Sequence, residues 1–245
     1  MIEVDKMNRP YIICHMVTSV DGKVTGDFLS HPSAEPAIST YYEINRKYKN
    51  QGSNGFICGR VTMEGSFTGG WYPDLTEYAA VTKDGDLKRD FIPEKLSGYY
   101  AIAFDTHGRL GWRSATVIDP DGDPGYDGAQ IIEVLSEGID ERYLGYLEAM
   151  GIPYIFAGKD HIDVAIALSK LKDLFGCDTL LLEGGSIING AFARAGAVDE
   201  ISLVVAPVAA DKEGKSLFMD SVILDLEMTN VENENGTLVL NYKKK

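Results

Sequence analysis

The feature that most constrains the fold is a junction at residues 180–192, where an apolar run passes through two glycines into a helical pattern. Leu180, Leu181 and Leu182 form a short apolar run, which is typical of a strand covered on both faces. Gly184 and Gly185 end this run, and apolar residues then recur with helical spacing. Because strands buried on both faces occur in sheets layered with helices, the junction indicates an α/β fold.

Segments typical of strands and of helices alternate along most of the chain. The expected strands are residues 11–19, 55–59, 99–104, 116–118, 131–135, 154–156, 180–183 and 201–206, and the expected helices are residues 33–50, 140–150 and 164–175. This alternation predicts a mostly parallel sheet, to which residues 222–226 and 238–242 add a C-terminal antiparallel hairpin. Since no repeat or linker divides the chain, we expect one domain over residues 1–245.

The composition argues against several classes of function. A net charge of −14 disfavours a nucleic-acid partner, which requires a basic surface. No apolar run is long enough to cross a membrane, and the first six residues lack the form of a signal peptide. Cys14, Cys58 and Cys177 are widely spaced and odd in number, which indicates buried free thiols in a cytoplasmic protein. The histidines show no ligand spacing, so we expect no metal.

Two strand–glycine–helix junctions carry polar residues that suit an anion. Glu183 ends the leucine strand, at the position where ligands bind in open α/β sheets, and the N–H groups at the following helix start favour anions. At the second junction, Arg60 and Thr62 follow Gly59 with a cation and a hydroxyl that suit a phosphate. Both patterns are also compatible with purely structural turns. His15, inside the first expected strand, is either a packed core histidine or a group that projects into a ligand cleft.

The usual Gly-x-Gly-x-x-Gly fingerprint and the Gly-x-x-x-x-Gly-Lys-[Ser/Thr] phosphate loop are both absent. Four short segments instead resemble, in the same order, the reductase domain of the riboflavin-biosynthesis deaminase/reductase. These segments are Ser19-Val20-Asp21-Gly22-Lys23, Gly59-Arg60-Val61-Thr62, Phe104-Asp105-Thr106 and Glu183-Gly184-Gly185-Ser186. The resemblance implies a dihydrofolate reductase-like fold, with three layers around a central mixed, mostly parallel sheet. It also implies a stand-alone reductase without the deaminase domain.

The chemistry implied by the resemblance is hydride transfer from NADPH to C1′ of a ribosylamino-pyrimidine 5′-phosphate. Thr106 and Arg109 are implied to contact the adenosine 2′-phosphate. The full set implied to bind the cofactor is Ser19, Gly59, Arg60, Thr62, Thr106, Arg109, Gly184, Gly185 and Ser186. The catalytic candidates on the substrate side are Glu183, Asp21 and His15.

Two positions on the substrate side depart from the riboflavin-pathway pattern. His15 stands where a lysine is usual, and Ser66 stands near an expected aspartate. We expect a reductase similar to the 5-amino-6-(5-phosphoribosylamino)uracil reductase; a dihydrofolate- or pteridine-type reductase and a non-catalytic NADPH-binding protein are the alternatives.

The apolar residues near the C-terminus predict a homodimer, and the loop at residues 66–93 is expected to serve as a lid or an oligomer contact.

Overall fold

The computed structural model describes residues 8–81, 89–220, 222–234 and 236–245. The chain divides into two compact units, one formed by Asn54–Asp178 with the first ten residues and the other by Tyr11–Ser53 with Thr179–Lys245. The expectation of a single domain stays a prediction. The residues that argued against a signal peptide, and residues 82–88 of the expected loop, lie outside the described part of the chain.

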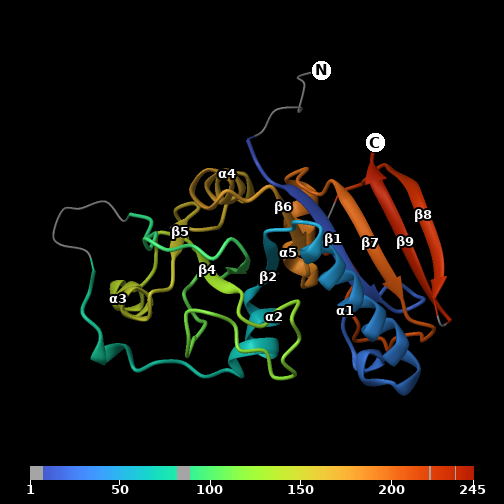
Figure 1. Ribbon diagram of the computed structural model, residues 1–245, viewed down its shortest axis with the longest axis horizontal. Coiled ribbons are helices and arrows are strands. Elements are labelled where there is room, and N and C mark those ends of the chain that lie inside the picture. Colours follow the sequence, from blue (N-terminus) through green and yellow to red (C-terminus); the bar gives the residue numbers. More distant parts are fainter. Residues whose placement is uncertain (1–7, 82–88, 221, 235) are drawn as a thin grey trace. The chain divides into compact units, whose positions relative to one another are not determined.

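The first unit is built on a parallel sheet with the strand order β5-β4-β3-β2 (Figure 1). Its strands are β2 (Gly55–Gly59), β3 (Tyr100–Phe104), β4 (Gln130–Leu135) and β5 (Tyr154–Phe156). Its helices are α2 (Arg60–Met63), η3 (Glu64–Thr68), η4 (Leu75–Glu77), α3 (Glu141–Met150) and α4 (Val164–Phe175). Parallel neighbours need crossover connections, which α3 supplies between β4 and β5.

The helices α3 and α4 begin and end where the sequence predicts. The side chain of Asp140 accepts a hydrogen bond from the Arg142 N–H, and Gly151 ends α3 in the left-handed conformation with φ 68°. Asp163 caps α4 in the same way, and Gly176 ends it with φ 67°. Side-chain caps satisfy N–H groups that the first helical turn leaves unpaired, and glycine adopts positive φ without steric cost.

The second unit holds a mixed sheet with the strand order β6-β1-β7-β9-β8 (Figure 1). The parallel strands are β6 (Thr179–Leu182), β1 (Tyr11–Thr18) and β7 (Glu200–Val205), and the antiparallel strands are β9 (Thr237–Lys244) and β8 (Leu226–Glu234). The helices are η1 (Asp27–Ser30), η2 (Pro32–Ala34), α1 (Glu35–Asn50) and α5 (Ser186–Arg194).

The core of the second unit lies on both sides of β1. Every residue of β1 from Ile12 to Thr18 is buried, so both faces of this strand are covered. On one face Val17 packs with Phe28, Ala37 and Val204 beneath α1. The strand β8 contrasts with β1, because eight of its nine residues are exposed.

The architecture confirms the α/β class, the mostly parallel strands and the C-terminal antiparallel hairpin. The first strand of this hairpin begins at Leu226, so the expectation of a strand at residues 222–225 was wrong. The expectation of a strand at residues 116–118 was wrong: Thr116 forms an isolated bridge with Gln130, and Val117 exchanges hydrogen bonds with the turn at residues 128–129. The start of the expected loop at residues 66–68 is helical, since it continues α2 as η3.

Candidate active site

Glu183 follows β6 directly and is held by the helix α1. Its carboxylate accepts a hydrogen bond of 2.7 Å from Nδ2 of Asn45, and the Glu183 side chain is 6% exposed. Asn45 is fully buried, and its own Oδ1 has no hydrogen-bond partner among the described residues. A carboxylate and an unpaired amide oxygen both accept hydrogen bonds, so this end of β6 favours a ligand that carries N–H or O–H donors.

The turn from β6 into α5 is made by backbone. Gly184 has φ 91°, and a Cβ at this position would come within 3.0 Å of Cε of Met16, so glycine is required here. Gly185 has φ −74° and begins α5 without a side-chain cap. Asn189, one turn into α5, is fully buried and its Oδ1 also lacks a partner among the described residues.

The helix α5 is fixed by the segment 216–220. The hydroxyl of Ser186 donates to the carbonyl of Ser216, and Nδ2 of Asn189 donates to the carbonyl of Leu217 at 3.2 Å. A Cβ on Gly190 would come within 1.7 Å of the Met219 carbonyl oxygen, so the two backbones approach closely. The Ser186 hydroxyl is therefore engaged within the protein, and only the backbone at this helix start is left for an anion.

Ser19 and Asp21 form a polar turn after β1. The Ser19 hydroxyl donates to Oδ1 of Asp21 at 2.6 Å and accepts from the Lys23 N–H at 3.0 Å. The Ala210 N–H also donates to Asp21 Oδ1, at 2.9 Å. The hydrogen bond from Ser19 lowers the pKa of Asp21 most, and the hydrogen bond from Ala210 lowers it further. This exposed side chain is therefore an anion at neutral pH.

His15 lies in the core between β1 and α1 and does not project into a cavity. Its Nε2 donates to the carbonyl of Tyr41 at 3.0 Å; Nδ1, 3.1 Å from Oγ of Ser202, therefore accepts from that hydroxyl. The imidazole also stacks on the Tyr41 ring, with 4.4 Å between ring centroids. Burial lowers the pKa of His15 to about 4. This geometry favours the interpretation of His15 as a packed core histidine over that of a group that contacts a ligand.

In the first unit, Arg60 begins α2 directly after Gly59. Its guanidinium pairs with Glu64 one turn later, with 2.6 Å between Nη1 and Oε2. Both side chains are about one-third exposed, at 31% and 36%, so the pair is open to an incoming phosphate. Thr62 is half-buried on the same short helix.

Asp105 follows β3 and organises the loop that carries Thr106 and Arg109. Its carboxylate accepts from the backbone N–H groups of His107 at 3.4 Å, of Leu110 at 2.8 Å and of Arg109. Burial raises the pKa of Asp105, while these hydrogen bonds and the charge of Arg60 oppose that rise. The exposed side chain of Arg109 is therefore presented by a loop closed on a single carboxylate.

The structure thus brings the candidates together in two sets, one within each unit. Glu183, Gly184, Gly185 and Ser186 share the β6–α5 junction of the second unit, and Ser19 with Asp21 forms a separate turn there. Gly59, Arg60 and Thr62 share the β2–α2 junction of the first unit, and the charge of Arg60 acts on Asp105 beside Thr106 and Arg109.

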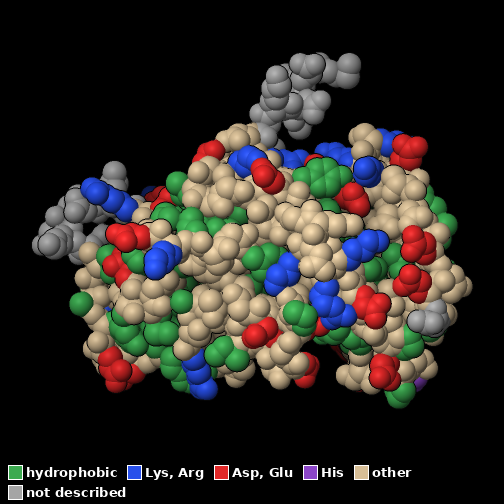
Figure 2. Space-filling view, viewed as in Figure 1, with side chains coloured by type: hydrophobic (Ala, Val, Ile, Leu, Met, Phe, Trp, Pro, Cys, Tyr) green, Lys and Arg blue, Asp and Glu red, His purple; other side chains and the backbone are tan. Residues whose placement is uncertain are grey.

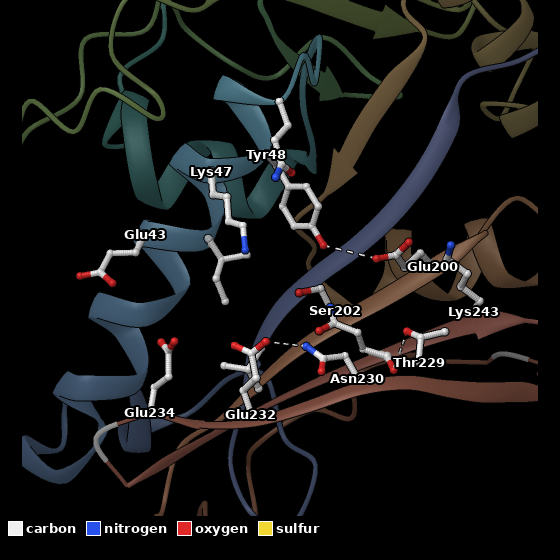
Figure 3. Close-up of a pocket in the computed structure, with 14 residues that line it drawn as sticks. Glu43, Lys47, Tyr48, Glu200, Ser202, Thr229, Asn230, Glu232, Glu234 and Lys243 are labelled. Carbon is white, nitrogen blue, oxygen red and sulfur yellow. Dashed lines mark hydrogen bonds between the residues drawn. The ribbon is translucent and has the colours of Figure 1, made fainter.

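A separate groove of about 500 Å³ lies in the second unit and contains none of these candidates (Figure 3). It is lined by α1 and the strands β7, β8 and β9, with Lys47, Tyr48, Glu200, Glu232 and Lys243 among its side chains. Its acidic and basic groups are mixed, which selects no single class of ligand. On the face shown in Figure 2, acidic and basic side chains are likewise interspersed.

Two buried residues near these junctions, Asn45 and Asn189, are not predicted from the sequence, and a third, Asp105, is named there without a role. Asn45 sits one turn from Tyr41 on the buried face of α1, and a polar residue at such a position is a signal that was available. Asn189 follows Ile187 and Ile188 at the start of α5. The sequence pattern names Asp105 only as the middle residue of Phe104-Asp105-Thr106. In all three cases the informative property is burial, which the residue type alone does not disclose.

Solved structures identify the class of fold. The chain is similar to a pyrimidine reductase-like protein of Corynebacterium diphtheriae, with a TM-score of 0.66 and 17% identity over 97% of this chain and 93% of that one. It is also similar to RibD of Acinetobacter baumannii, with a TM-score of 0.61 and 16% identity. That match covers 97% of this chain and 58% of the Acinetobacter protein. The fold is that of the dihydrofolate reductase-like riboflavin-pathway reductases.

Sequence comparisons identify the relatives. Residues 126–240 match the family model of the RibD C-terminal domain. The 2,5-diamino-6-ribosylamino-4(3H)-pyrimidinone 5′-phosphate reductase of Methanothermobacter thermautotrophicus is 29% identical over 247 residues, which is 97% of this chain and 99% of that protein. These matches confirm the resemblance seen in the sequence: the chain is related to the RibD reductases and is an oxidoreductase.

This relationship implies a nicotinamide cofactor, and the described residues fit one. In the second unit, the uncapped start of α5 offers N–H groups to a phosphate, and the unpaired Oδ1 of Asn189 offers an acceptor. In the first unit, taken by itself, the partly exposed Arg60 offers a cation. Among the helices that the structure describes, none is long and apolar enough to span a bilayer.

Proposed function

We propose that this protein is a nicotinamide-dependent reductase of the riboflavin pathway, which reduces a ribosylamino-pyrimidine 5′-phosphate to its ribitylamino product. The observation that carries the proposal is the similarity to the pyrimidinone phosphate reductase, which extends over 97% of this chain. The bound nicotinamide supplies the hydride, and the residues of this chain bind and orient both ligands.

The proposed cofactor is NADPH. Arg60 and Arg109 are the cations that suit its phosphates, and the backbone at Gly184 and Gly185 offers close approach to the pyrophosphate without a capping side chain. The hydroxyls of Thr62 and Thr106 are proposed as further phosphate contacts, with Ser186 contributing its backbone and Ser19 standing near the nicotinamide. The three cysteines are free and buried, in agreement with the cytoplasm that we propose as the location.

Glu183 is proposed to bind the pyrimidine ring. A carboxylate only accepts hydrogen bonds, so it complements an edge that presents ring N–H and amino groups. The 2,5-diamino substrate of the Methanothermobacter relative presents a 2-amino donor where the uracil form has a carbonyl oxygen. We therefore propose the diaminopyrimidinone as the better substrate of the two. Asp21 is proposed to stand at the substrate side as an anion.

The activity is tested with the purified chain, NADPH and each of the two pyrimidine phosphates. The expected result is a fall in the near-ultraviolet absorbance of NADPH, together with a product that has gained two hydrogens by mass spectrometry. A dihydropteridine or dihydrofolate acceptor serves as the competing substrate. Consumption only with that acceptor, or tight binding of NADPH with no consumption on any acceptor, would reject the proposal.

A homodimer is proposed as the assembly, formed through the outer face of β7, β9 and β8. One row of this face is Leu203, Leu240 and Val231, which lie opposite one another in the strand register. Val231 is 55% exposed, and Met228 in the neighbouring row is 52% exposed. An apolar sheet face that is this accessible favours association with a second copy.

The assembly is tested by replacing Val231 with Lys, which puts a charge in the centre of this face. Light scattering should report a dimer for the parent and a monomer for V231K. Glu232→Lys is the matched control, because adjacent residues of a strand point to opposite faces. Loss of the dimer in both variants, or in neither, would place the contact elsewhere.

A further inference from the structure

The loop at residues 105–112 is held in place by hydrogen bonds from several side chains outside it. Its carbonyl groups accept from hydroxyls of three surrounding elements. The hydrogen bonds run from Ser136 to Thr106 at 2.7 Å, from Tyr72 to Gly108 at 2.8 Å, from Tyr143 to Leu110 at 2.8 Å and from Tyr146 to Trp112. At Gly108, which has φ 60°, a Cβ would come within 2.6 Å of the Tyr143 ring.

The two ends of this loop are each fixed by a buried carboxyl group. Asp105 holds the first end through three backbone N–H groups. Glu133, in the middle of β4, holds the other end, because the indole Nε1 of Trp112 donates to its Oε1. Glu133 is fully buried and Trp112 is 3% exposed, so the contact is shielded from solvent.

The second oxygen of Glu133 has no hydrogen-bond partner among the described residues. The groups that face Glu133 are Asp105 from the end of β3, Tyr143 and Tyr146 from α3, and Tyr72. None of these is a cation. Burial, followed by the charge of Asp105, raises the pKa of Glu133 well above its usual range. The hydrogen bond from Trp112 and the nearby Tyr143 hydroxyl oppose this rise, but an ionised carboxylate would be buried beside Asp105 with no cation among the groups named, so the neutral acid fits this site.

We propose that Glu133 is a positioning residue for the cofactor: through Trp112 it fixes the loop 105–112, and thereby the placement of Thr106 and Arg109 at the 2′-phosphate. This inference rests on the role proposed above for Thr106 and Arg109. Glu133 touches neither ligand itself. Loss of the Glu133 acceptor frees Trp112 and loosens the loop, which lowers the affinity for NADPH while leaving NADH, which has no 2′-phosphate, unaffected.

The first test is spectroscopic and uses no cofactor. The chain has two tryptophans, so Trp71→Phe leaves Trp112 as the single emitter. Its fluorescence should change with pH in one step whose midpoint lies above 4.5, the ordinary value for glutamate. Glu133→Gln in this background should abolish the step. Glu148→Gln is the matched control, because Glu148 accepts a hydrogen bond from Tyr154 away from this loop, and it should keep the step.

The second test measures the dissociation constants of NADPH and NADH for variants that keep or remove the acceptor for Trp112. Glu133→Leu removes this acceptor, so its preference for NADPH should be about three- to ten-fold smaller than that of the parent, which is the loss expected for one hydrogen bond. Glu133→Gln keeps an acceptor oxygen for the indole N–H and should retain most of the preference. Unchanged NADH binding in each variant shows that the protein is folded.

The outcomes separate the inference from the proposed function. A fluorescence step that survives Glu133→Gln, or a preference for NADPH that is unchanged in Glu133→Leu, would overturn the positioning role. Should the parent bind neither cofactor, the proposed function fails; the positioning role at the 2′-phosphate then fails with it, while the fluorescence step still reports whether Glu133 titrates against Trp112.

Discussion

Asp105 and Glu183 stand at equivalent points of the two units, each directly after a buried parallel strand. Both carboxylates are nearly inaccessible, with exposures of 1% and 6%. Asp105 is bound by N–H groups of its own loop, two to five residues away. Glu183 is instead held by Asn45, 138 residues earlier in the chain, and that amide has an acceptor left unpaired. Asp105 therefore organises its own loop, whereas Glu183 lies beside an amide oxygen that can still accept a hydrogen bond from a ligand.

The largest expected effect is a loss of unfolding free energy at acidic pH, and it arises at the contact between β1 and α1, the helix that holds Glu183. His15 joins β1 to α1, and burial lowers its pKa from 6.5 to about 4. A base whose pKa is depressed by folding stabilises the folded state above pH 6.5 and loses this contribution as pH falls towards 4. The loss between these values is about 3 kcal/mol of unfolding free energy.

This prediction is checked by urea unfolding at several pH values. His15→Gln cannot titrate, so its unfolding free energy should fall less steeply than that of the parent between pH 6.5 and 4. His31→Gln is the control, because His31 is exposed. Parallel pH profiles for the parent and His15→Gln would show that His15 titrates normally and is not tied between the strand and the helix.

The second effect concerns Asp105 as a structural carboxylate. Asp105→Asn keeps one acceptor oxygen but turns an NH₂ group towards backbone N–H donors, which should cost about 2 kcal/mol of unfolding free energy. Asp119→Asn is the matched control, since Asp119 also accepts from two backbone N–H groups, at 2.9 and 3.0 Å, but in an exposed loop. Equal and small losses in both variants would remove the distinction drawn for Asp105.

The comparison also shows what the sequence could predict. The parallel strands, the caps at Asp140 and Gly151 and the hairpin follow from local patterns, because period, capping residues and glycines act over a few positions. The roles of Asp105 and Glu183 do not follow in this way. Both are acids at strand ends, and their different partners are set by the fold.

The same reason explains the errors and the omissions. His15 has apolar neighbours in a strand, and nothing in that pattern reports that Tyr41 and Ser202 satisfy both ring nitrogens. Gly184 and Gly185 look alike in sequence, yet only Gly184 has a positive φ. The proposed roles of the site residues themselves stay predictions, for which the structure supplies burial and hydrogen bonds.

The third effect tests Glu183 as a ligand-binding carboxylate. Glu183→Gln keeps an acceptor for Asn45 but removes the charge and presents a donor to the pyrimidine edge. The melting temperature and the affinity for NADPH should stay unchanged, while kcat/KM falls about ten-fold, or about 1.4 kcal/mol of transition-state stabilisation. A clear drop in melting temperature with unchanged kcat/KM would make Glu183 a structural residue like Asp105.

The smallest effect on stability, and the sharpest on cofactor choice, is expected at Arg60. Its pair with Glu64 is partly exposed, and such pairs contribute at most about 1 kcal/mol, so Arg60→Gln should barely change the melting temperature. A charge-assisted contact to a phosphate is stronger, and its loss should weaken NADPH binding about ten-fold. Arg142→Gln removes a similar exposed pair, with Asp140, and should leave both properties nearly unchanged. If the two variants bind NADPH equally well, Arg60 serves only its helix, and the cation for the cofactor must be Arg109, which the loop closed by Asp105 presents.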